Sequence, residues 1–386
     1  MPAAAAHDRY LATRHFGSLD GLRFLCITAV LWHHTPFREE IVQLSILFRR
    51  GHVGVDFFFV LSGFLITTLL LREEAAKGRF SLRGFYWRRI LRIVPLYFFV
   101  ISLAAFYAIG IKGYTEQIEI LPYYYLFLSN FLSAEHIGFL APTWSLSVEE
   151  QYYLIWPTLL LFLPRRWITP VLLALIAVNV LSAAGFFGLL GIGPIETGHL
   201  RFAIEGATYA PILMGSLVAI LLQDRVWFAR MNRVTGFAGA PWLWFLALLL
   251  ALAAFPGVLE GWPNLVVHSL MALMLVSLVV REDNAMAPIL KFRPIERIGQ
   301  ISYGIYLYHL FAAALVTKLA IMVGWTHWAP VLLGYYAMTI VIAEISFRTL
   351  EAWFLGLRHK RIGLVDASLG RIRTSIPDKF SGRDHR

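Results

Sequence analysis

The 386-residue chain is poor in cysteine and in charged side chains. Its one cysteine, Cys26, cannot form an internal disulfide, so the cysteine count says nothing about the redox compartment. A lone apolar cysteine of this kind is more typical of packing than of nucleophilic chemistry. Charged residues make up 15% of the chain, whereas apolar residues make up 58% and the mean hydropathy is +0.65. This composition excludes an ordinary soluble domain and indicates a multispanning membrane protein.

Apolar runs long enough to cross a bilayer recur along most of the chain. We therefore expect an all-α, polytopic membrane fold with about ten transmembrane helices. No small-residue cleavage site follows the first run, and an arginine lies in its middle third, which favours a retained helix over a signal peptide. The predicted crossings are residues 19–35, 52–71, 93–111, 143–163, 168–190, 207–222, 240–256, 264–280, 300–323 and 329–352.

The formal net charge of +10 could suit a nucleic-acid partner, but the positions of Lys and Arg give a better account of it. If the N-terminus is cytoplasmic, 27 of the 34 basic residues fall on the inner side and five on the outer side. Basic residues gather in the cytoplasmic loops of membrane proteins. The sequence therefore predicts that both termini are cytoplasmic and that no nucleic acid is bound.

The stretch from Ile118 to Ser133 is apolar and aromatic, but Pro122 interrupts it and it is short for a full crossing. Counting it as a span would put the later basic loops outside, so we predict a re-entrant or interfacial segment that roofs a cavity. The predicted organisation is a cytoplasmic N-terminus at 1–18, a transmembrane domain at 19–353 and a basic cytoplasmic tail at 354–386 that lies against anionic lipid.

Arg23 and His34 lie in the first apolar segment, where ionisable side chains are costly and are rarely kept without a function. Eleven residues at 3.6 per turn bring the helix to within roughly 20° of its starting face, so both side chains point into one groove. They stand roughly 16 Å apart along the helix axis. We therefore expect two tasks at two depths of one cavity.

The second span runs back from the outer side and carries Asp56 near the predicted depth of His34. A carboxylate beside an imidazole fixes its tautomer, so that the other ring nitrogen can remove a proton from a hydroxyl near neutral pH. We accordingly predict His34 as a general base and Asp56 as its orienting partner. A structural hydrogen bond between two helices is the alternative, and His33 is the fallback base.

Arg88, Arg89 and Arg92 are spaced along one helical face at a membrane boundary. Guanidinium groups bind phosphate with two hydrogen bonds, and Arg23 at similar depth would extend this cationic path inward. The cluster therefore predicts binding of a phosphorylated donor. Basic residues that merely anchor a span are the alternative.

The fourth span begins from the outer side with Trp144 and carries the adjacent carboxylates Glu149 and Glu150. Carboxylates at an outer mouth suit a hydroxyl-rich ligand, and Trp144 could stack on a sugar ring. The alternative is a capping box formed by Ser147 and Glu150, which leaves Glu149 unexplained.

Tyr306 and His309 follow Ser302 at helical spacing in the ninth span, with His309 near the predicted midplane of the bilayer. Either these side chains line the same cavity, or a helix interface satisfies them. No metal-ligand set is expected.

Together these segments resemble the acyltransferase 3 family of multispanning bacterial acyltransferases, over nearly the whole chain. The order of the motifs makes the resemblance specific. It rests on Arg23 followed by ten residues and His34, on Gly54-Val-Asp56-Phe-Phe-Phe-Val-Leu-Ser-Gly63-Phe-Leu, on Arg89-Ile-Leu-Arg92, on Trp144-Ser-Leu-Ser-Val-Glu-Glu-Gln-Tyr-Tyr and on Ile301-Ser-Tyr-Gly-Ile-Tyr-Leu-Tyr-His309.

The resemblance implies a ten-helix acyltransferase in the bacterial inner membrane, with Arg23 and His34 essential and with Arg89 and Arg92 required near the donor. Its donor would be acyl coenzyme A, with acetyl as the favoured group, and its acceptor a hydroxyl of an outer glycan or a lipid-linked sugar. We expect a stand-alone form without the outer hydrolase-like domain that longer members carry.

Two mechanisms remain open at this stage, because His34 could act as the base in a direct transfer or as the nucleophile that forms an acyl-imidazole. A proton-coupled transporter or flippase is the rival class, since ionisable residues at several depths also occur in carriers. We find no clear pairing of the first five spans with the last five, which disfavours the carrier.

Overall fold

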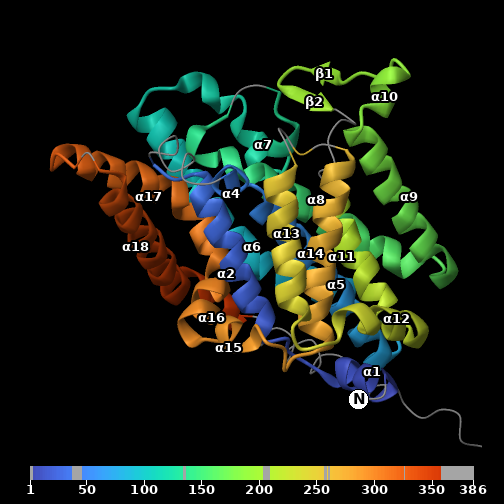
Figure 1. The fold of residues 1–386 in the computed structure, drawn as a ribbon. Helices are drawn as coiled ribbons and strands as arrows, with labels where there is room; N and C mark the ends of the chain where they lie inside the picture. The colour runs from blue at the N-terminus through green and yellow to red at the C-terminus, as the bar shows by residue number, and fades with distance from the viewer. Residues whose placement is uncertain are drawn as a thin grey trace, which may run out of the picture.

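The computed structural model describes residues 3–36, 46–133, 136–202, 209–255, 259, 261–325 and 327–357. Long helices run between two ends of the molecule (Figure 1). At the N-terminal end lie α1 (Ala3–Ala12), α12 (Arg225–Thr235), α15 (Ala287–Leu290) and α16 (Arg293–Gln300). At the far end lie α4 (Ile46–Arg49), α7 (Leu121–Tyr125), α10 (Phe186–Leu189) and the antiparallel hairpin of β1 (Ile195–Thr197) and β2 (Leu200–Phe202).

Each predicted crossing contains a helix. These helices are α2 (Ser18–His33), α5 (Val53–Lys77), α6 (Leu82–Ala105), α8 (Trp144–Phe162), α9 (Arg165–Ala183), α11 (Ala210–Leu221), α13 (Ala240–Ala254), α14 (Trp262–Val280), α17 (Ser302–Met322) and α18 (Trp328–Ser346). Within the described ranges, six helices are long and apolar enough to cross a membrane, so the chain is a multi-pass membrane protein. Ten crossings stay a prediction, since α2 and α13 have 16 and 15 residues and α11 meets α12 at a bend of 113°.

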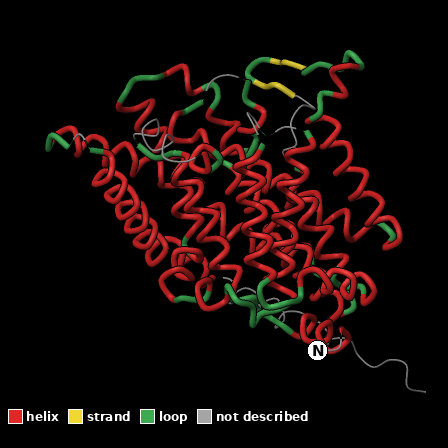
Figure 2. Tube along the Cα trace, in the orientation of Figure 1, coloured by secondary structure: helices red, strands yellow, loops and turns green. Residues whose placement is uncertain are grey.

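The predicted re-entrant stretch forms only short helical pieces at the far end, beside the hairpin (Figure 2). They are η2 (Thr115–Ile118), α7 and η3 (Ser129–Phe131), and they follow η1 (Phe106–Ile111), which continues α6. The short helix η4 (Gly138–Thr143) then leads into α8, and η5 (Phe347–Glu351) extends α18. The predicted tail at 354–386 lies outside the described residues from 358 onward.

Close backbone contacts fix the helices that carry the site. A Cβ atom added at Gly63 of α5 would lie 1.9 Å from the carbonyl oxygen of Ile212 in α11. One added at Gly299 of α16 would lie 1.8 Å from that of Asp20 in α2. Glycine is therefore required at both contacts, because any side chain would force the helices apart. The contacts leave α2 and α5 with little freedom to rotate.

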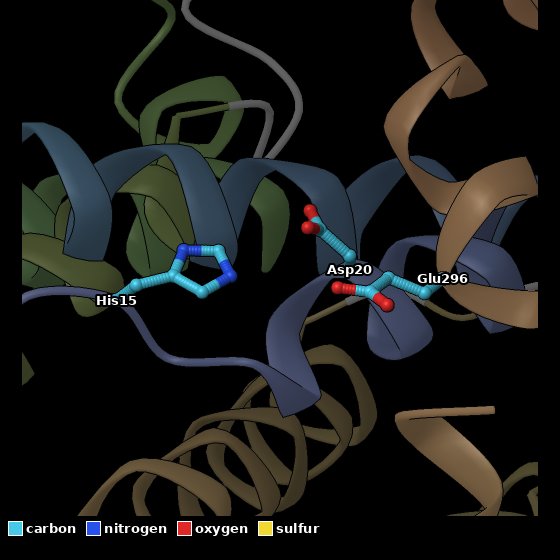
Figure 3. A group of neighbouring side chains, drawn as sticks. All are labelled: His15, Asp20 and Glu296. Atoms are coloured by element: carbon cyan, nitrogen blue, oxygen red, sulfur yellow. The ribbon is translucent and has the colours of Figure 1, made fainter. Parts of the chain in front are cut away.

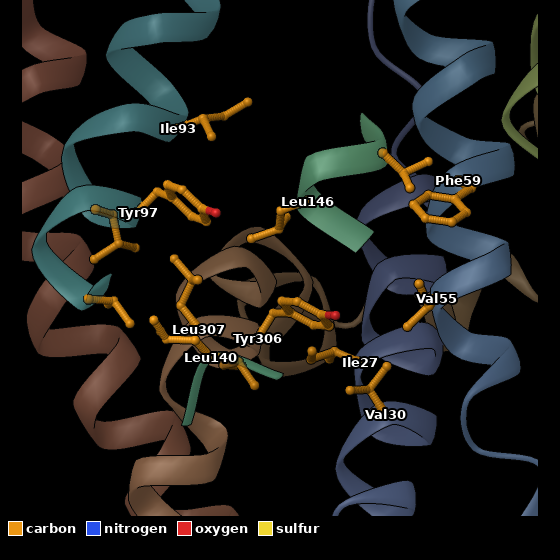
Figure 4. Packing of buried hydrophobic residues seen from close by; sticks show 14 of the residues in the cluster. Ile27, Val30, Val55, Phe59, Ile93, Tyr97, Leu140, Leu146, Tyr306 and Leu307 are labelled. Atoms are coloured by element: carbon orange, nitrogen blue, oxygen red, sulfur yellow. The ribbon is translucent and has the colours of Figure 1, made fainter. Parts of the chain in front are cut away.

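A large group of buried apolar residues packs between α2, α5, α6 and α17 (Figure 4). Tyr306 extends from α17 into this group towards Val55 and Ile27. Helix α2 ends at His33, and His34 caps it. Pro36 follows two residues later, as expected because proline cannot continue a helix. The imidazole of His34 is thereby placed at the far end of α2.

Candidate active site

Three cavities follow one another through the helical bundle, and we call this series the file of cavities. The N-side cavity has a volume of about 440 Å³, and its ionisable lining residues include Arg14, Arg23, Arg72, Arg89, Arg92 and Glu351. The middle cavity has a volume of about 100 Å³, and its polar lining residues include Arg23, Ser62, Arg89, Glu149, Tyr303 and Tyr306. The far-side cavity has a volume of about 360 Å³, and its lining residues include His33, His34, His52, Asp56, Trp144 and Tyr306.

Shared walls join these cavities. Arg23, Ser62 and Arg89 line both the N-side and the middle cavity. Val55 and Tyr306 line both the middle and the far-side cavity. The sequence predicted that Arg23 and His34 face one groove at two depths. The structure places Arg23 on the N-side and middle cavities and His34 on the far-side cavity.

One face of α5 runs along the whole file. Its lining residues are Val55, Asp56, Phe58, Phe59, Ser62, Leu65, Thr68, Leu69 and Arg72. Most are three or four residues apart, which is the spacing of one helical face. From Val55 to Arg72 the face extends roughly 25 Å, so a single helix passes from the arginines to the histidines.

His34 is held by its own helix. Its Nδ1 lies 3.2 Å from the carbonyl oxygen of Val30, which can only accept a hydrogen bond, so Nδ1 donates and Nε2 is the basic nitrogen. On another side its ring contacts that of His309, with ring centroids 4.8 Å apart. The Val30 carbonyl therefore sets the tautomer needed for a base in the far-side cavity.

Asp56 has a different partner from the one expected. It lines the far-side cavity with His34, but its Oδ2 lies 3.3 Å from Nε2 of His268 in α14. His268 is buried, with 3% of its side chain exposed, whereas 23% of the Asp56 side chain is exposed. The expected orienting pair is thus corrected, because the packing of α14 on α5 brings in an imidazole that the motif does not contain.

Two of the three predicted phosphate-binding arginines reach the cavities. Arg89 and Arg92 line both the N-side and the middle cavity. The guanidinium carbon of Arg89 lies 4.9 Å from the ring centre of Tyr153, a stacked arrangement that holds the group in place. Arg88 does not line either cavity, and its Nη2 donates to Glu73 at 3.1 Å. Arg88 precedes Arg89 by one residue, which turns its side chain by about 100° around the helix axis, and this corrects the expectation of a three-arginine face.

Glu149 lies deeper than expected. It lines the middle cavity together with Arg23 and Arg89, and it accepts a hydrogen bond of 2.6 Å from Ser62. The prediction of two carboxylates at the outer mouth is therefore corrected, because Glu149 stands more than one turn inside α8. Glu150 lines none of the three cavities.

The capping box expected as an alternative is not formed either. Thr143 precedes the first residue of α8 and makes no side-chain capping bond. Ser147 instead bonds Ser129, with 2.9 Å between the two hydroxyl oxygens. Trp144 does line the far-side cavity, and its ring meets that of Phe59 edge to face at 6.2 Å.

Tyr306 separates the middle cavity from the far-side cavity. Its hydroxyl lies 2.6 Å from the carbonyl oxygen of Pro142 and 2.7 Å from the hydroxyl of Ser145. His309 lines none of the three cavities; it is fully buried, and its Nδ1 donates to the Tyr306 carbonyl oxygen at 2.6 Å. Of the two roles considered for this helix, Tyr306 lines the cavity and His309 packs behind His34.

His136, from the loop before η4, also lines the far-side cavity. Its Nδ1 lies 3.5 Å from the hydroxyl of Tyr124. Partial burial lowers the pKa of His136, so the neutral imidazole is favoured there at neutral pH.

His15, Asp20 and Glu296 converge at the N-terminal end of α2 (Figure 3). One ligand atom from each lies within 4.8 Å of the others, a spacing that could serve a cation, although the sequence indicated no metal site. Oδ1 of Asp20 already accepts a hydrogen bond of 2.7 Å from Arg23. That guanidinium would repel a metal ion, and the pair instead holds Arg23 at the cavity wall.

Sequence reasoning missed Ser62, Arg72, Tyr303 and His268. The first two lie on the cavity face of α5 and could have been found from their helical spacing after Asp56. Nothing in the sequence pairs His268 with Asp56.

Residues 16–347 match the model of a family described as an acyltransferase domain. The chain belongs to this family. This membership confirms the resemblance that the ordered motifs carried.

Curated relatives in this acyltransferase family share modest identity with the chain. The peptidoglycan O-acetyltransferase OatA of Listeria monocytogenes is 28% identical over 365 residues, covering 88% of this chain and 55% of the relative. The putative peptidoglycan O-acetyltransferase YrhL of Bacillus subtilis is 26% identical, over 89% of this chain and 55% of the relative. The O-acetyltransferase OatA of Staphylococcus aureus is 23% identical, over 89% and 58%. The chain thus spans little more than half the length of these relatives, and no solved structure matches it.

Proposed function

We propose that this protein is an O-acetyltransferase that moves an acetyl group from cytosolic acetyl coenzyme A to a hydroxyl of a glycan on the other side of the bacterial inner membrane. The observation that carries this proposal is the file of cavities, which runs from a cluster of arginines to His34. A phosphorylated carrier and a hydroxyl acceptor could approach such a file from opposite ends.

The donor would bind from the N-terminal end. Arg89 and Arg92 stand where the N-side and middle cavities meet, and would hold the diphosphate of coenzyme A. The pantetheine arm would pass Arg23 through the middle cavity. Arg23 and His34 are roughly 16 Å apart along α2, so an extended arm anchored near Arg23 directs its thioester towards His34.

The acceptor would enter the far-side cavity. Nε2 of His34 removes the proton of the acceptor hydroxyl as its oxygen forms a bond to the acetyl carbon. The carbon–sulfur bond then breaks, and the imidazolium returns the proton to the thiolate of coenzyme A. An acyl-imidazole on His34 would follow the same path in two steps. Both routes need His34, and in both the acetyl thioester passes Tyr306 to reach it.

The acceptor we favour is a cell-wall glycan, because the relatives of the chain are named as acting on peptidoglycan. Trp144 on the far-side cavity offers a ring on which a sugar could stack. Cytoplasmic termini follow from the excess of basic residues in the loops on that side, among them those of α12 and α16 at the N-terminal end.

The test is transfer by purified protein in lipid nanodiscs. Acetyl coenzyme A labelled in the acetyl group is supplied with soluble peptidoglycan fragments, and esterified label and free thiol are measured. Wild type should form both, and His34→Ala should lose about 10² to 10⁴ in rate. His33→Ala, in the adjacent residue, should stay within an order of magnitude of wild type. Movement of a sugar across the bilayer without consumption of thioester would instead indicate a carrier.

A further inference from the structure

Arg72 occupies a rigid position at the wall of the N-side cavity. Its guanidinium carbon lies 4.9 Å from the ring centre of Phe16 and 5.7 Å from that of Tyr10. Its Nη2 donates to the backbone carbonyl of Tyr10 at 3.1 Å. These contacts hold the guanidinium against two neighbouring rings and leave part of its edge for further hydrogen bonds.

The charge of Arg72 is not balanced by a carboxylate. Arg72 and Arg14 line the N-side cavity, and neither forms an ion pair with any residue in the described ranges. By contrast, Arg23 on the same cavity pairs with Asp20. A half-buried cation without a counter-ion is costly, and a bound anion would remove that cost.

Thr68 adds a donor beside Arg72. It lies one turn earlier on the same face of α5, lines the N-side cavity and is buried. Among the described residues, Nε of Arg72 has no hydrogen-bond partner, whereas the Thr68 hydroxyl interacts with the Tyr10 hydroxyl. Unpartnered polar groups at a cavity wall are satisfied by water or by a ligand.

The position of Arg72 along α5 distinguishes it from Arg89 and Arg92. Those two line the middle cavity as well, whereas Arg72 lines the N-side cavity alone. It stands ten residues beyond Ser62, or roughly 15 Å further from the reacting end. In coenzyme A the diphosphate is closer to the thiol, and the 3′-phosphate on the ribose is more distant. A phosphate monoester also carries about two negative charges at pH 7, which suits two unpaired arginines.

We propose that Arg72, with Thr68 and Arg14, forms a phosphomonoester subsite that recognises the 3′-phosphate of the donor. The subsite selects coenzyme A over carriers that end at the diphosphate. This inference rests on the proposed function, because that function supplies the donor.

The experiment compares coenzyme A with dephospho-coenzyme A, which lacks the 3′-phosphate. Both are titrated calorimetrically into wild type, Arg72→Gln and a control, Arg83→Gln, which replaces an exposed arginine that lines none of the three cavities. Wild type and the control should bind coenzyme A about tenfold more tightly than the dephospho form, the scale of a charge-assisted hydrogen bond. Arg72→Gln should bring this ratio to about one and leave the affinity for the dephospho form unchanged.

An equal loss for both ligands in Arg72→Gln, or an unchanged ratio, would overturn the subsite. If Arg72→Gln does not fold, Arg72→Lys and Thr68→Val are measured in its place. Each should lower the ratio of the affinity for coenzyme A to the affinity for dephospho-coenzyme A. If wild type binds neither ligand, the proposed function fails by itself. The subsite is then judged with adenosine 3′,5′-bisphosphate against adenosine 5′-monophosphate, and it falls if wild type does not prefer the bisphosphate or if Arg72→Gln keeps that preference.

Discussion

The carboxylate of Asp56 lies 3.3 Å from Nε2 of His268, and this contact joins α5 to α14 at the wall of the far-side cavity. His34 lines the same cavity but takes its orientation from the Val30 carbonyl. His34 and His268 are therefore held separately: His34 lines the cavity, whereas His268 contacts the acidic group from α14 and lines none of the three cavities. A carboxylate and an imidazole at this distance, on two neighbouring helices of a membrane protein, form a pair whose coupling substitutions should reveal.

Asp56→Asn and His268→Gln should each lower acetyl transfer, and together they should lower it no further than the worse single change. The reason is that either substitution breaks the same contact, with a coupling of about 1 to 3 kcal/mol. Initial rates of the four proteins in the double-mutant cycle give this coupling. Strictly additive losses would show that the two residues act independently.

Arg89→Gln and Arg88→Gln should differ although the residues are adjacent. Arg89 lines the N-side and middle cavities, where we propose that the donor binds, so its loss should raise the KM for acetyl coenzyme A about tenfold. Arg88 pairs with Glu73 away from them, so its KM should change less than about twofold. Steady-state kinetics at constant salt measure the KM of both variants. Equal increases in KM would show that Arg88 also contributes to donor binding.

Tyr306→Ala should let water reach the thioester. The side chain separates the middle cavity from the far-side cavity, so its removal should increase acetyl coenzyme A hydrolysis without acceptor and reduce ester formation. Tyr306→Phe keeps the ring and should keep hydrolysis low. Free thiol and esterified label are measured in parallel. Unchanged hydrolysis in the alanine variant would show that Tyr306 is not the barrier.

Gly63→Ala should destabilise the protein by about 1 to 3 kcal/mol or more, because its Cβ would overlap the Ile212 carbonyl where α5 contacts α11. Gly188→Ala is the matched control, since no heavy atom lies within 4 Å of a Cβ there. Thermal unfolding in detergent compares the two. Equal midpoints would mean that α5 and α11 can move apart at little cost.

Much of the fold and part of the site followed from local sequence. Hydropathy located a helix in every predicted crossing, and the interrupted stretch at 118–133 formed only short pieces. The eleven-residue spacing of Arg23 and His34 placed both on one file of cavities, because helical periodicity is a property of the single helix. The number of complete crossings does not follow from hydropathy, since bends and short helices depend on the surrounding protein.

Sequence alone therefore determined the membrane class, the family and the two ends of α2 that carry Arg23 and His34. Tertiary structure decided which side chains meet: Asp56 with His268, Glu149 with Ser62, and Arg88 with Glu73. Each of these pairs joins different helices, so it depends on their rotation and depth. Those are set by backbone contacts such as the one at Gly63, which no spacing within one helix can reveal.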